Sequence, residues 1–594
     1  MNNVITIASD ERITDMYNHF KVIAGPGAGK THWLVEHIKN VLQNATTLHK
    51  TSRIACITYT TIGAEEIRKR LGGYQDKVEV STIHSFLYTN VVKPYLYLLN
   101  DDENGISVDV KAMDGHSDNV ASKWALRKWH EKANNWHIGD SLKVKKYLEG
   151  LQWQLDGNNI ALRPRPEDKQ GLKIRYSDLP LYKQAFWERG IIHHEDVLYF
   201  SHTILNKYPI ILSHLVGKYP FLFLDEFQDT NTIQVEIVKW FANAGSIVGV
   251  IGDPAQSIYS FQGASREAFV NFTLPNQSTY VIENNRRSGT RIVELLNFLR
   301  DADDVTQSTI RHNSVHEVYF LEEDGNPTQI VQCFHELRRH LGMDSDYCIL
   351  ARKNETVKLL RNSNSVDVWR VFEEADSSER EPFIRGILTG YKLAMDNRQE
   401  LAIKEIVRAL RSNRDRMLRN PFKENQLISS LIKRSLAVDL LEYMVGELNN
   451  LEDIVFTDFY ESLRQFFEVR NYGLKKITSG KIKQFSDETT LTVLLDNLTL
   501  PEEKSANVRT IHKAKGAEFQ SVLLYLTDLD DVKKLVKPDI DSKNDDTRLL
   551  YVALSRAKDL LCIACPPLDT QLRNKLRSMN LIQYTTDKAP VGTA

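Results

Sequence analysis

Short apolar runs alternate along the chain with longer stretches of helical periodicity. Val22-Ile23-Ala24 is one such run, and it precedes a glycine-rich turn and a helical pattern over 30–41. Further runs at 53–58, 221–224 and 247–251 repeat the arrangement, and the first of them leads into a helical pattern over 62–71. Compact apolar runs are typical of strands buried on both faces of a parallel sheet. Their alternation with helices predicts a doubly wound α/β core.

A second series of the same kind begins near Tyr280, with strand candidates at 347–350, 521–526 and 560–564. A mainly helical stretch interrupts each series, and a chain of 594 residues is long enough for several hydrophobic cores. The pattern therefore predicts four segments: a first core over 1–95 and 206–280, its insertion over 96–205, a second core over 281–374 and 496–594, and its insertion over 375–495.

Composition favours a soluble, multidomain protein. Hydrophobic residues make up 42% of the chain and charged residues 26%, as in globular proteins, and no apolar run reaches the roughly 18 to 20 residues that span a bilayer. Charges stand where a signal peptide would be apolar, and five cysteines are too few for a disulfide framework. We therefore expect a cytoplasmic protein. The net charge of −2 neither supports nor excludes nucleic-acid binding, because large proteins bind such partners through local grooves.

A phosphate-binding loop is predicted between the first strand and the first helix. The segment reads Ala24-Gly25-Pro26-Gly27-Ala28-Gly29-Lys30-Thr31. Glycines let backbone N–H groups face phosphates, and the helix N-terminus adds partial positive charge. Lys30 would reach the β and γ phosphates of ATP, and the Thr31 hydroxyl would bind Mg²⁺. Ala24 departs from the strict pattern, so a glycine turn with a surface lysine is the alternative.

Two carboxylates complete this chemistry at the end of another buried strand. Phe221-Leu222-Phe223-Leu224 is followed by Asp225-Glu226-Phe227-Gln228-Asp229, and the carboxyl ends of parallel strands are where such sheets bind ligands. Asp225 can hold Mg²⁺, and Glu226 can orient and deprotonate an attacking water. The alternative, two acids that merely cap a helix, leaves the glycine-rich loop upstream without a partner.

At this point the chain resembles the UvrD/Rep/PcrA group of superfamily 1A DNA helicases. DEFQD is similar to that group's acidic box, and further similar segments follow in the family's order: Ile57-Thr58-Tyr59-Thr60-Thr61, Thr82-Ile83-His84-Ser85-Phe86, Gly252-Asp253-Pro254-Ala255-Gln256-Ser257-Ile258-Tyr259, 510–519 (TIHKAKGAEF) and 548–557 (RLLYVALSRA). The resemblance implies two RecA-like parallel-sheet cores, 1A and 2A, with helical insertions 1B and 2B. It also implies an ATP-dependent DNA helicase that uses Mg²⁺ and moves 3′-to-5′ on single-stranded DNA.

The resemblance assigns roles to residues in both cores. Gln256 would sense the γ-phosphate, while Arg287 and Arg556 would complete charge stabilisation from the second core. Glu518 is similar to the acid that accepts the ribose hydroxyl. Each arginine taken alone is more simply a solvated helix residue, and its place relative to the other motifs favours the catalytic interpretation.

Three departures from the family concern the nucleobase. The family usually has a glutamine-containing motif before the phosphate-binding loop, whereas the first glutamine of this chain is Gln43, after the loop. Arg286 stands where the family has an aromatic residue, and His32 stands where it has an arginine. Arg286 could still stack on the base through its guanidinium plane, and His32 could offer a ring. We therefore expect ATP to be used with weakened discrimination against other nucleotides.

The single-stranded DNA track is expected along polar and aromatic residues of the same motifs. Aromatic side chains suit a motor that moves on any DNA sequence, because every base has a face on which they can stack. By resemblance the contacts are Thr58, Tyr59, Thr82, His84, Ser85, Tyr259, Phe261, His512 and Lys515. Packing in the core is the alternative for Tyr59 and Tyr259. Two basic stretches in the second insertion are candidates for duplex DNA or simply solvated faces: Lys404, Arg408, Arg411, Arg414, Arg416, Arg419 and Lys423, with Glu405, Asp415 and Glu424 as opposing charges, and Arg470, Lys475, Lys476, Lys481 and Lys483.

Three other patterns are interpreted as structural. Cys562 and Cys565 lie in an apolar run that reads as a buried strand. His193-His194-Glu195-Asp196 would not converge on a metal from one helix, and Trp124, Trp129, Trp136 and Trp153 are better explained by core packing than by stacking on DNA.

Two alternatives to an unwinding motor remain open. One is a translocase that strips proteins from DNA without unwinding it. The other is a DNA-activated ATPase that acts as sensor or scaffold for a partner nuclease, as in Gabija-type antiviral defence.

Overall fold

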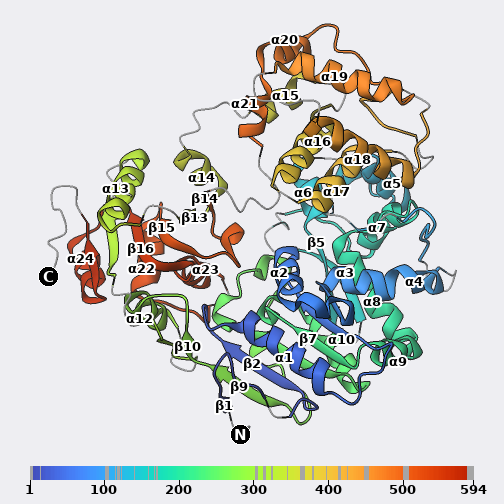
Figure 1. Cartoon of the computed structure of the whole chain (residues 1–594). Coiled ribbons are helices and arrows are strands. Elements are labelled where there is room, and N and C mark those ends of the chain that lie inside the picture. The colour runs from blue at the N-terminus through green and yellow to red at the C-terminus, as the bar shows by residue number, and fades with distance from the viewer. Residues whose placement is uncertain are drawn as a thin grey trace. The chain divides into compact units, whose positions relative to one another are not determined.

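The computed structural model divides the chain into two compact units, residues 1–360 with 507–594, and residues 361–506. It describes residues 4–584 apart from 14, 101–105, 114, 117–118, 120, 122, 140, 158, 166–167, 169–170, 301–304, 312–315, 323–325, 344–345, 362–367, 377–379, 397, 413–416, 424–425, 447–453, 499–506 and 543. Figure 1 shows both cores in the first unit.

A seven-stranded parallel sheet forms the first core, in the order β1-β9-β2-β8-β7-β3-β4. Its strands are β1 (Val4–Thr6), β2 (Phe20–Ala24), β3 (Ile54–Thr58), β4 (Val78–Thr82), β7 (Phe221–Leu224), β8 (Ile247–Gly252) and β9 (Ser278–Ile282). Alternate residues of β3 enter different hydrophobic cores: Ile54 and Cys56 one, Ala55 and Ile57 the other. Burial on both faces accounts for the nearly continuous apolar runs in the sequence.

Different helices cover the two faces of this sheet. The core that contains Ile54 is completed by α1 (Lys30–Asn44) and α2 (Thr61–Leu71). The core that contains Ala55 includes α3 (Ile83–Leu87), α8 (His194–Lys207), α9 (Pro209–Lys218), α10 (Thr232–Asn243) and α11 (Arg266–Val270). The hydrophobic core that contains Ala55 continues without a break into the first insertion.

The first insertion is helical but carries one antiparallel hairpin, β5 (Leu151–Asp156) with β6 (Asn159–Pro164), which the sequence pattern did not predict. Its helices are α5 (Lys123–Ala133), α6 (Leu142–Glu149) and α7 (Leu179–Trp187). Trp129 and Trp153 are buried and Trp124 is half-buried, as a packing role requires, whereas Trp136 is 55% exposed.

Asp196 anchors this insertion. Its buried carboxylate lies 3.1 Å from the equally buried Lys183 ammonium and accepts hydrogen bonds from the Trp153 and Trp187 indoles. His193 and Asp196 form the capping box of α8. The structural interpretation of the segment 193–196 is therefore supported. No group of three or more His, Cys, Asp or Glu side chains suited to a metal ion occurs among the described residues.

The second core is a six-stranded parallel sheet in the order β14-β13-β15-β16-β12-β17. Its strands are β12 (Val318–Glu322), β13 (Tyr347–Ala351), β14 (Val508–Thr510), β15 (Phe519–Tyr525), β16 (Ala557–Cys565) and β17 (Leu581–Gln583). One face packs against α12 (Thr290–Leu299), α22 (Leu529–Val536), α23 (Asp546–Leu554) and α24 (Thr570–Ser578), and the other against α13 (Pro327–His340) and α14 (Asn354–Leu360). Cys562 and Cys565 enter different hydrophobic cores, on opposite faces of β16, so they cannot share a metal ion.

One strand assignment from the sequence is wrong. Tyr280, taken as the start of the second series, lies in β9 of the first sheet and pairs with Val22 of the strand before the glycine-rich loop. The chain passes to the second core only afterwards, through the short parallel pair β10 (Asn284–Asn285) and β11 (Ser308–Thr309).

The unit 361–506 is helical, with α15 (Val368–Ala375), α16 (Arg380–Met395), α17 (Gln399–Ala409), α18 (Ser430–Gly446), α19 (Phe456–Val469), α20 (Lys481–Glu488) and α21 (Leu491–Asp496) around one apolar core. Within the basic stretches, Arg408 pairs with Glu405 at 2.6 Å and Lys483 with Asp487 at 2.6 Å. Arg414, Asp415, Arg416 and Glu424 lie outside the described residues.

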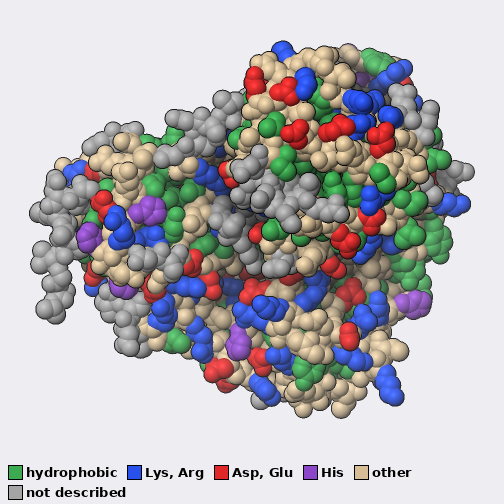
Figure 2. All heavy atoms as spheres, turned by 45° about the horizontal axis from the view of Figure 1, so that its top comes forward, with side chains coloured by type: hydrophobic (Ala, Val, Ile, Leu, Met, Phe, Trp, Pro, Cys, Tyr) green, Lys and Arg blue, Asp and Glu red, His purple; other side chains and the backbone are tan. Residues whose placement is uncertain are grey.

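Basic and acidic side chains are interspersed on the face of the molecule that Figure 2 shows. This fits the nearly balanced composition. Among the described helices, none combines the length and the apolar character that crossing a bilayer requires.

Candidate active site

The glycine-rich loop joins β2 to α1, as the sequence predicts. Gly27 and Gly29 have φ values of 69° and 87°, in the left-handed region that favours glycine. The Lys30 ammonium is buried and donates to the carbonyls of Ala24 and Gly25, both at 3.1 Å. The two carbonyls therefore accept the hydrogen bonds that the Lys30 ammonium would donate to phosphate oxygens when a nucleotide is bound.

The two carboxylates follow β7 directly. Asp225 accepts a hydrogen bond from the Thr31 hydroxyl at 3.4 Å, so the two expected Mg²⁺ ligands are neighbours. Glu226 has a φ of 54°, an uncommon conformation for a residue with a side chain, and such conformations cluster at active sites. Its carboxylate accepts a hydrogen bond from Gln228.

The two carboxyl groups are shifted in opposite directions. Burial, and then the charge of Glu226, raise the pKa of Asp225 to about 7. Burial alone would raise the pKa of Glu226 as well, but the charges of Lys30 and Lys515 lower it below its ordinary value. Glu226 thus stays ionised and able to accept a proton, which is what a general base needs.

Both predicted arginines reach this cavity from the second core. Arg556, on the turn after α23, is buried and donates to Gln256 Oε1 at 3.0 Å. Arg287 donates to Glu518 at 2.6 Å and to the Ser555 carbonyl at 3.1 Å. Burial, and then the charge of Arg287, lower the pKa of Arg556 to about 9, so it remains a cation at neutral pH.

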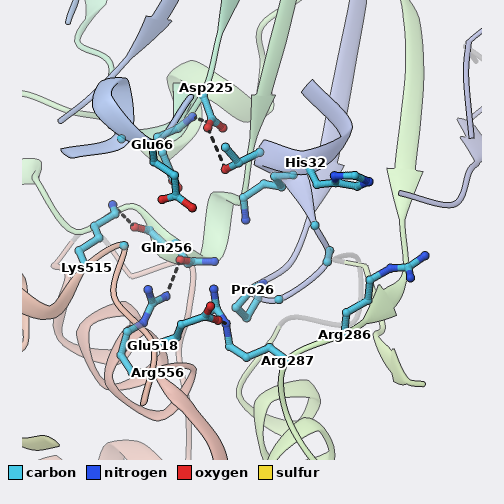
Figure 3. A pocket seen from close by; sticks show the side chains of 18 of the residues that line it. Pro26, His32, Glu66, Asp225, Gln256, Arg286, Arg287, Lys515, Glu518 and Arg556 are labelled. Carbon is cyan, nitrogen blue, oxygen red and sulfur yellow. Dashed lines mark hydrogen bonds and ion pairs between the residues drawn. The ribbon is translucent and has the colours of Figure 1, made fainter. Parts of the chain in front are cut away.

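These residues line one cavity of about 480 Å³ between the two cores (Figure 3), a volume in the range of small-molecule sites. Its Lys and Arg side chains outnumber its carboxylates: Lys30, Arg70, Arg286, Arg287, Arg311, Lys515, Arg556 and Lys558 against Glu66, Asp225, Glu226 and Glu518. The lining is therefore suited to a polyanion such as a triphosphate.

The base-side residues also lie at this cavity. Arg286 and His32 are both among its lining, and Arg286 pairs with Asp10 at 3.2 Å. Glu518, expected at the ribose, is held by Arg287 at 2.6 Å and lies 3.8 Å from Lys558.

Two further contacts with the glycine-rich loop escaped the sequence analysis. Asn285 and Gln307 of the second-core segment donate side-chain N–H groups to the Pro26 carbonyl, at 2.9 and 3.2 Å. Asn285 adjoins a predicted motif and could have been found there, whereas no local pattern marks Gln307.

The residues expected at Mg²⁺ fit such an ion. Thr31 supplies a neutral oxygen and Asp225 a carboxylate, the hard oxygen ligands that Mg²⁺ prefers, beside a loop built for phosphates.

Four predicted DNA contacts form an aromatic cluster that draws on both cores. Tyr59 and Tyr259 stack with ring centroids 4.6 Å apart and an interplanar angle of 26°. The ring of Phe261, also of the first core, has its centroid 5.6 Å from that of His512 in the second core. Phe261 is 40% exposed. Its carbonyl accepts a hydrogen bond from Gln152 of the hairpin in the first insertion, a support that the sequence did not indicate.

Three other predicted contacts begin α3. Thr82 caps this helix by accepting from the Ser85 N–H at 3.3 Å, and it also donates to the Ser85 hydroxyl at 3.1 Å. Burial, and then the neighbouring His194, lower the pKa of His84 to about 3, so its ring is neutral.

Thr58 and Lys515 are placed differently from the expected DNA track. Both line the nucleotide cavity. The Lys515 ammonium is paired with the buried Asp229 carboxylate, donates to the Gln256 carbonyl at 2.8 Å and lies 4.7 Å from the Tyr259 ring centroid. Its side chain is only 6% exposed, because the facing core supplies all of these partners.

A glycine-rich phosphate loop, two strand-end carboxylates and two arginines from a second α/β core define a two-core ATPase. The UvrD/REP helicase N-terminal domain matches residues 7–276, and the UvrD-like helicase C-terminal domain matches residues 456–566. The chain belongs to the UvrD/Rep helicase family and is an ATP-dependent DNA helicase.

Two curated relatives match nearly the whole chain, and a third matches about half of it. The ATP-dependent DNA helicase Rep of Buchnera aphidicola is 23% identical over 91% of this chain and 91% of its own length. DNA helicase II of Haemophilus influenzae is 23% identical over 93% of this chain and 83% of its own. The Gabija protein GajB of Bacillus cereus is 26% identical over 48% of this chain and 47% of its own.

Proposed function

We propose that the chain moves along single-stranded DNA by opening and closing the cleft between its cores as it hydrolyses ATP, and that this movement separates duplex DNA. The hydrogen bond between Arg556 and Gln256 carries the proposal, because it joins a second-core guanidinium to a first-core residue at the cavity. The 3′-to-5′ direction rests on the family resemblance.

The residues have distinct tasks in hydrolysis. The oxygen of a water forms a bond to the γ-phosphorus while the bond from that phosphorus to the ADP oxygen breaks, and the water proton passes to Glu226. Lys30, Arg287 and Arg556 stabilise the developing negative charge, and removal of such an arginine typically lowers turnover by on the order of 10³-fold. When bound by Thr31 and Asp225, Mg²⁺ would neutralise charge on the β and γ oxygens. Arg286 and His32 flank the base, and Glu518 accepts from the ribose once released from Arg287.

Bases of the single strand stack on the aromatic cluster of Tyr59, Tyr259, Phe261 and His512. Stacking of this kind contributes roughly 1–3 kcal/mol for each base. We place the activity in the cytoplasm, in keeping with five cysteines that are all free thiols.

Turnover of ATP with and without single-stranded DNA tests the proposal. We expect strong stimulation by DNA in the wild type and its loss in Lys30→Ala, whereas Lys39→Ala on the same helix should behave like the wild type. Turnover that is indifferent to DNA, or that survives Lys30→Ala, would refute it. A strand-separation assay beside a displacement assay on protein-coated single strands distinguishes unwinding from protein removal.

A second candidate is a subunit that works with a nuclease in antiviral defence. The match to GajB over about half of each chain favours it. Copurification of an untagged nuclease would support this candidate, and robust unwinding by the isolated chain would count against it.

A further inference from the structure

A buried arginine outside the predicted motifs links the two cores. Arg300 follows α12 of the second core, and its guanidinium lies 3.4 Å from the Asp253 carboxylate of the first core, with side-chain exposures of 2% and 0%. It also donates to the Tyr551 hydroxyl at 2.8 Å. Burying a charge is costly unless it is paired, so this pair forms only when both cores contribute their members.

Asp253 also holds the side chain of Gln256, a residue of the active site, in place. One of its carboxylate oxygens accepts from the Gln256 amide nitrogen at 2.7 Å, and the other accepts from the Ala255 N–H at 3.1 Å. With its amide nitrogen committed to Asp253, Gln256 turns its amide oxygen to Arg556, which donates to it at 3.0 Å.

A continuous line of polar contacts thus runs from Arg300 through Asp253 and Gln256 to Arg556. Both of its ends belong to the second core and both of its middle members to the first. Tyr551, the second partner of Arg300, lies on α23, just before Arg556. The second core therefore contacts the hydrogen-bonded pair of Asp253 and Gln256 at both ends, through Arg300 and Arg556.

Two other contacts between the cores lack this connection. Arg548 donates to the Ser257 carbonyl at 2.7 Å, and Ser260 donates to Asp545 at 2.6 Å. These contacts hold the cores together without engaging the Gln256 amide. Arg300 differs because its partner is hydrogen-bonded directly to the group that faces Arg556.

We propose that Arg300 is a positioning residue for ATP hydrolysis. By fixing Asp253 it fixes the orientation of the Gln256 amide, so that Gln256 and Arg556 are presented together at the γ-phosphate side whenever the cores meet. The proposal rests on the roles of Gln256 and Arg556 given under "Proposed function".

Arg300→Met tests this by removing the charge while keeping a long side chain. We expect kcat for DNA-stimulated ATP hydrolysis to fall about 10- to 100-fold, the usual effect of losing one charge-assisted contact. KM for ATP should change less than about threefold, because Arg300 does not line the nucleotide cavity. Arg300→Lys should recover part of kcat, since an ammonium can still pair with Asp253.

Arg338→Met is the matched control. Arg338 is also buried, with 4% of the residue exposed against 8% for Arg300, but it belongs to α13 of the second core, where it lies 4.2 Å from the Tyr347 ring centroid. Its replacement should lower the melting temperature without changing kcat. Normal kcat in Arg300→Met, a rise in KM alone, or kcat losses that follow the loss of stability in both variants would overturn the proposal.

Gln256→Ala and Arg556→Ala belong in the same assay. Loss of turnover in these two variants with normal turnover in Arg300→Met refutes the positioning role alone. Normal turnover in Gln256→Ala or Arg556→Ala refutes the catalytic roles proposed above, and the positioning role with them.

Discussion

Replacing Lys515 by methionine separates two explanations for this residue. The family resemblance puts Lys515 on the DNA track, whereas the structure pairs its ammonium with Asp229 and the Gln256 carbonyl of the facing core. A DNA contact would contribute to binding of the strand. A tie between the cores would contribute to closure of the cleft and therefore to turnover.

The size of the effect follows from the burial of Asp229, whose side chain is fully buried. Removing one partner of a buried ion pair typically costs about 3–5 kcal/mol if the other keeps its charge. Burial raises the pKa of Asp229 to about 7 even with Lys515 in place, and without that cation the pKa rises further. The carboxyl group can therefore escape part of the cost by taking up a proton. Because a proton is scarcer at pH 8 than at pH 6, the deficit in kcat should be larger at pH 8, by at most about tenfold per pH unit.

The assay measures DNA affinity and turnover side by side. The logarithm of the affinity for a short oligothymidine is plotted against the logarithm of salt concentration, and one lost phosphate contact would reduce the slope by about 0.7. We expect Lys515→Met to keep the wild-type slope and to lose kcat. Lys513→Met, which removes an exposed lysine from the same turn, controls for the loss of a positive charge. A slope reduced by about 0.7 with normal kcat at saturating DNA would show that Lys515 contacts the strand and that our reasoning is wrong.

Three further predictions concern other sites. Because burial and Glu226 raise the pKa of Asp225 to about 7, Mg²⁺ must displace a proton below that pH, so the apparent Mg²⁺ affinity in ATP turnover should weaken about tenfold per unit below pH 7 and level off above it; a flat profile contradicts this. His37 stacks on Trp33 at 5.1 Å, neither of its ring nitrogens has a hydrogen-bond partner among the described residues, and burial lowers its pKa to about 3. The unfolded chain therefore binds a proton below about pH 6.5 that the folded chain refuses until about pH 3, and urea unfolding should show up to about 1.4 kcal/mol less stability from His37 for each unit of that interval, a loss that His37→Phe removes. Finally, with Arg286 in place of an aromatic residue, turnover of GTP and CTP should lie within about tenfold of ATP turnover, and strict ATP preference would contradict the weakened base discrimination.

The strands of both sheets could be predicted where burial on two faces leaves a run of apolar residues, as in Phe221–Leu224. Burial does not reveal which sheet a strand joins. Tyr280 pairs with Val22, more than 250 residues earlier in the chain, and no pattern around Tyr280 records that partner. The short β1 was missed for a different reason: Val4 and Ile5 are apolar, but the strand has only three residues, and its partner β9 lies far along the chain.

The active site divides in the same way. Glycine-rich turns and strand-end acids have local signatures, so Lys30 and Asp225 could be predicted from the sequence pattern itself, whereas Gln256 and Arg556 were predicted from the family resemblance. The partners of those groups depend on how the second core meets the first, which is not a local property. Lys515 was therefore predicted without the contacts to Asp229 and Gln256 that the structure gives it, and Arg300 was not predicted, since an arginine at the end of a helix has no distinguishing neighbours.

In the mechanism that we propose, the contacts at the cavity also account for the way nucleotide binding drives movement. Lys30 is held by the carbonyls of Ala24 and Gly25, Arg287 by Glu518, and Arg556 by Gln256. A triphosphate that enters must take each cation from a partner that belongs to the protein, so binding is an exchange of hydrogen bonds rather than a gain of new ones. Two of these exchanges involve second-core arginines, one of them bonded to a first-core residue, and they therefore alter the forces between the cores. Hydrolysis and phosphate release return the cations to their protein partners. Whether the cleft is open or closed thus depends on whether the arginines are bonded to the triphosphate or to the protein, which is the coupling that a DNA motor needs.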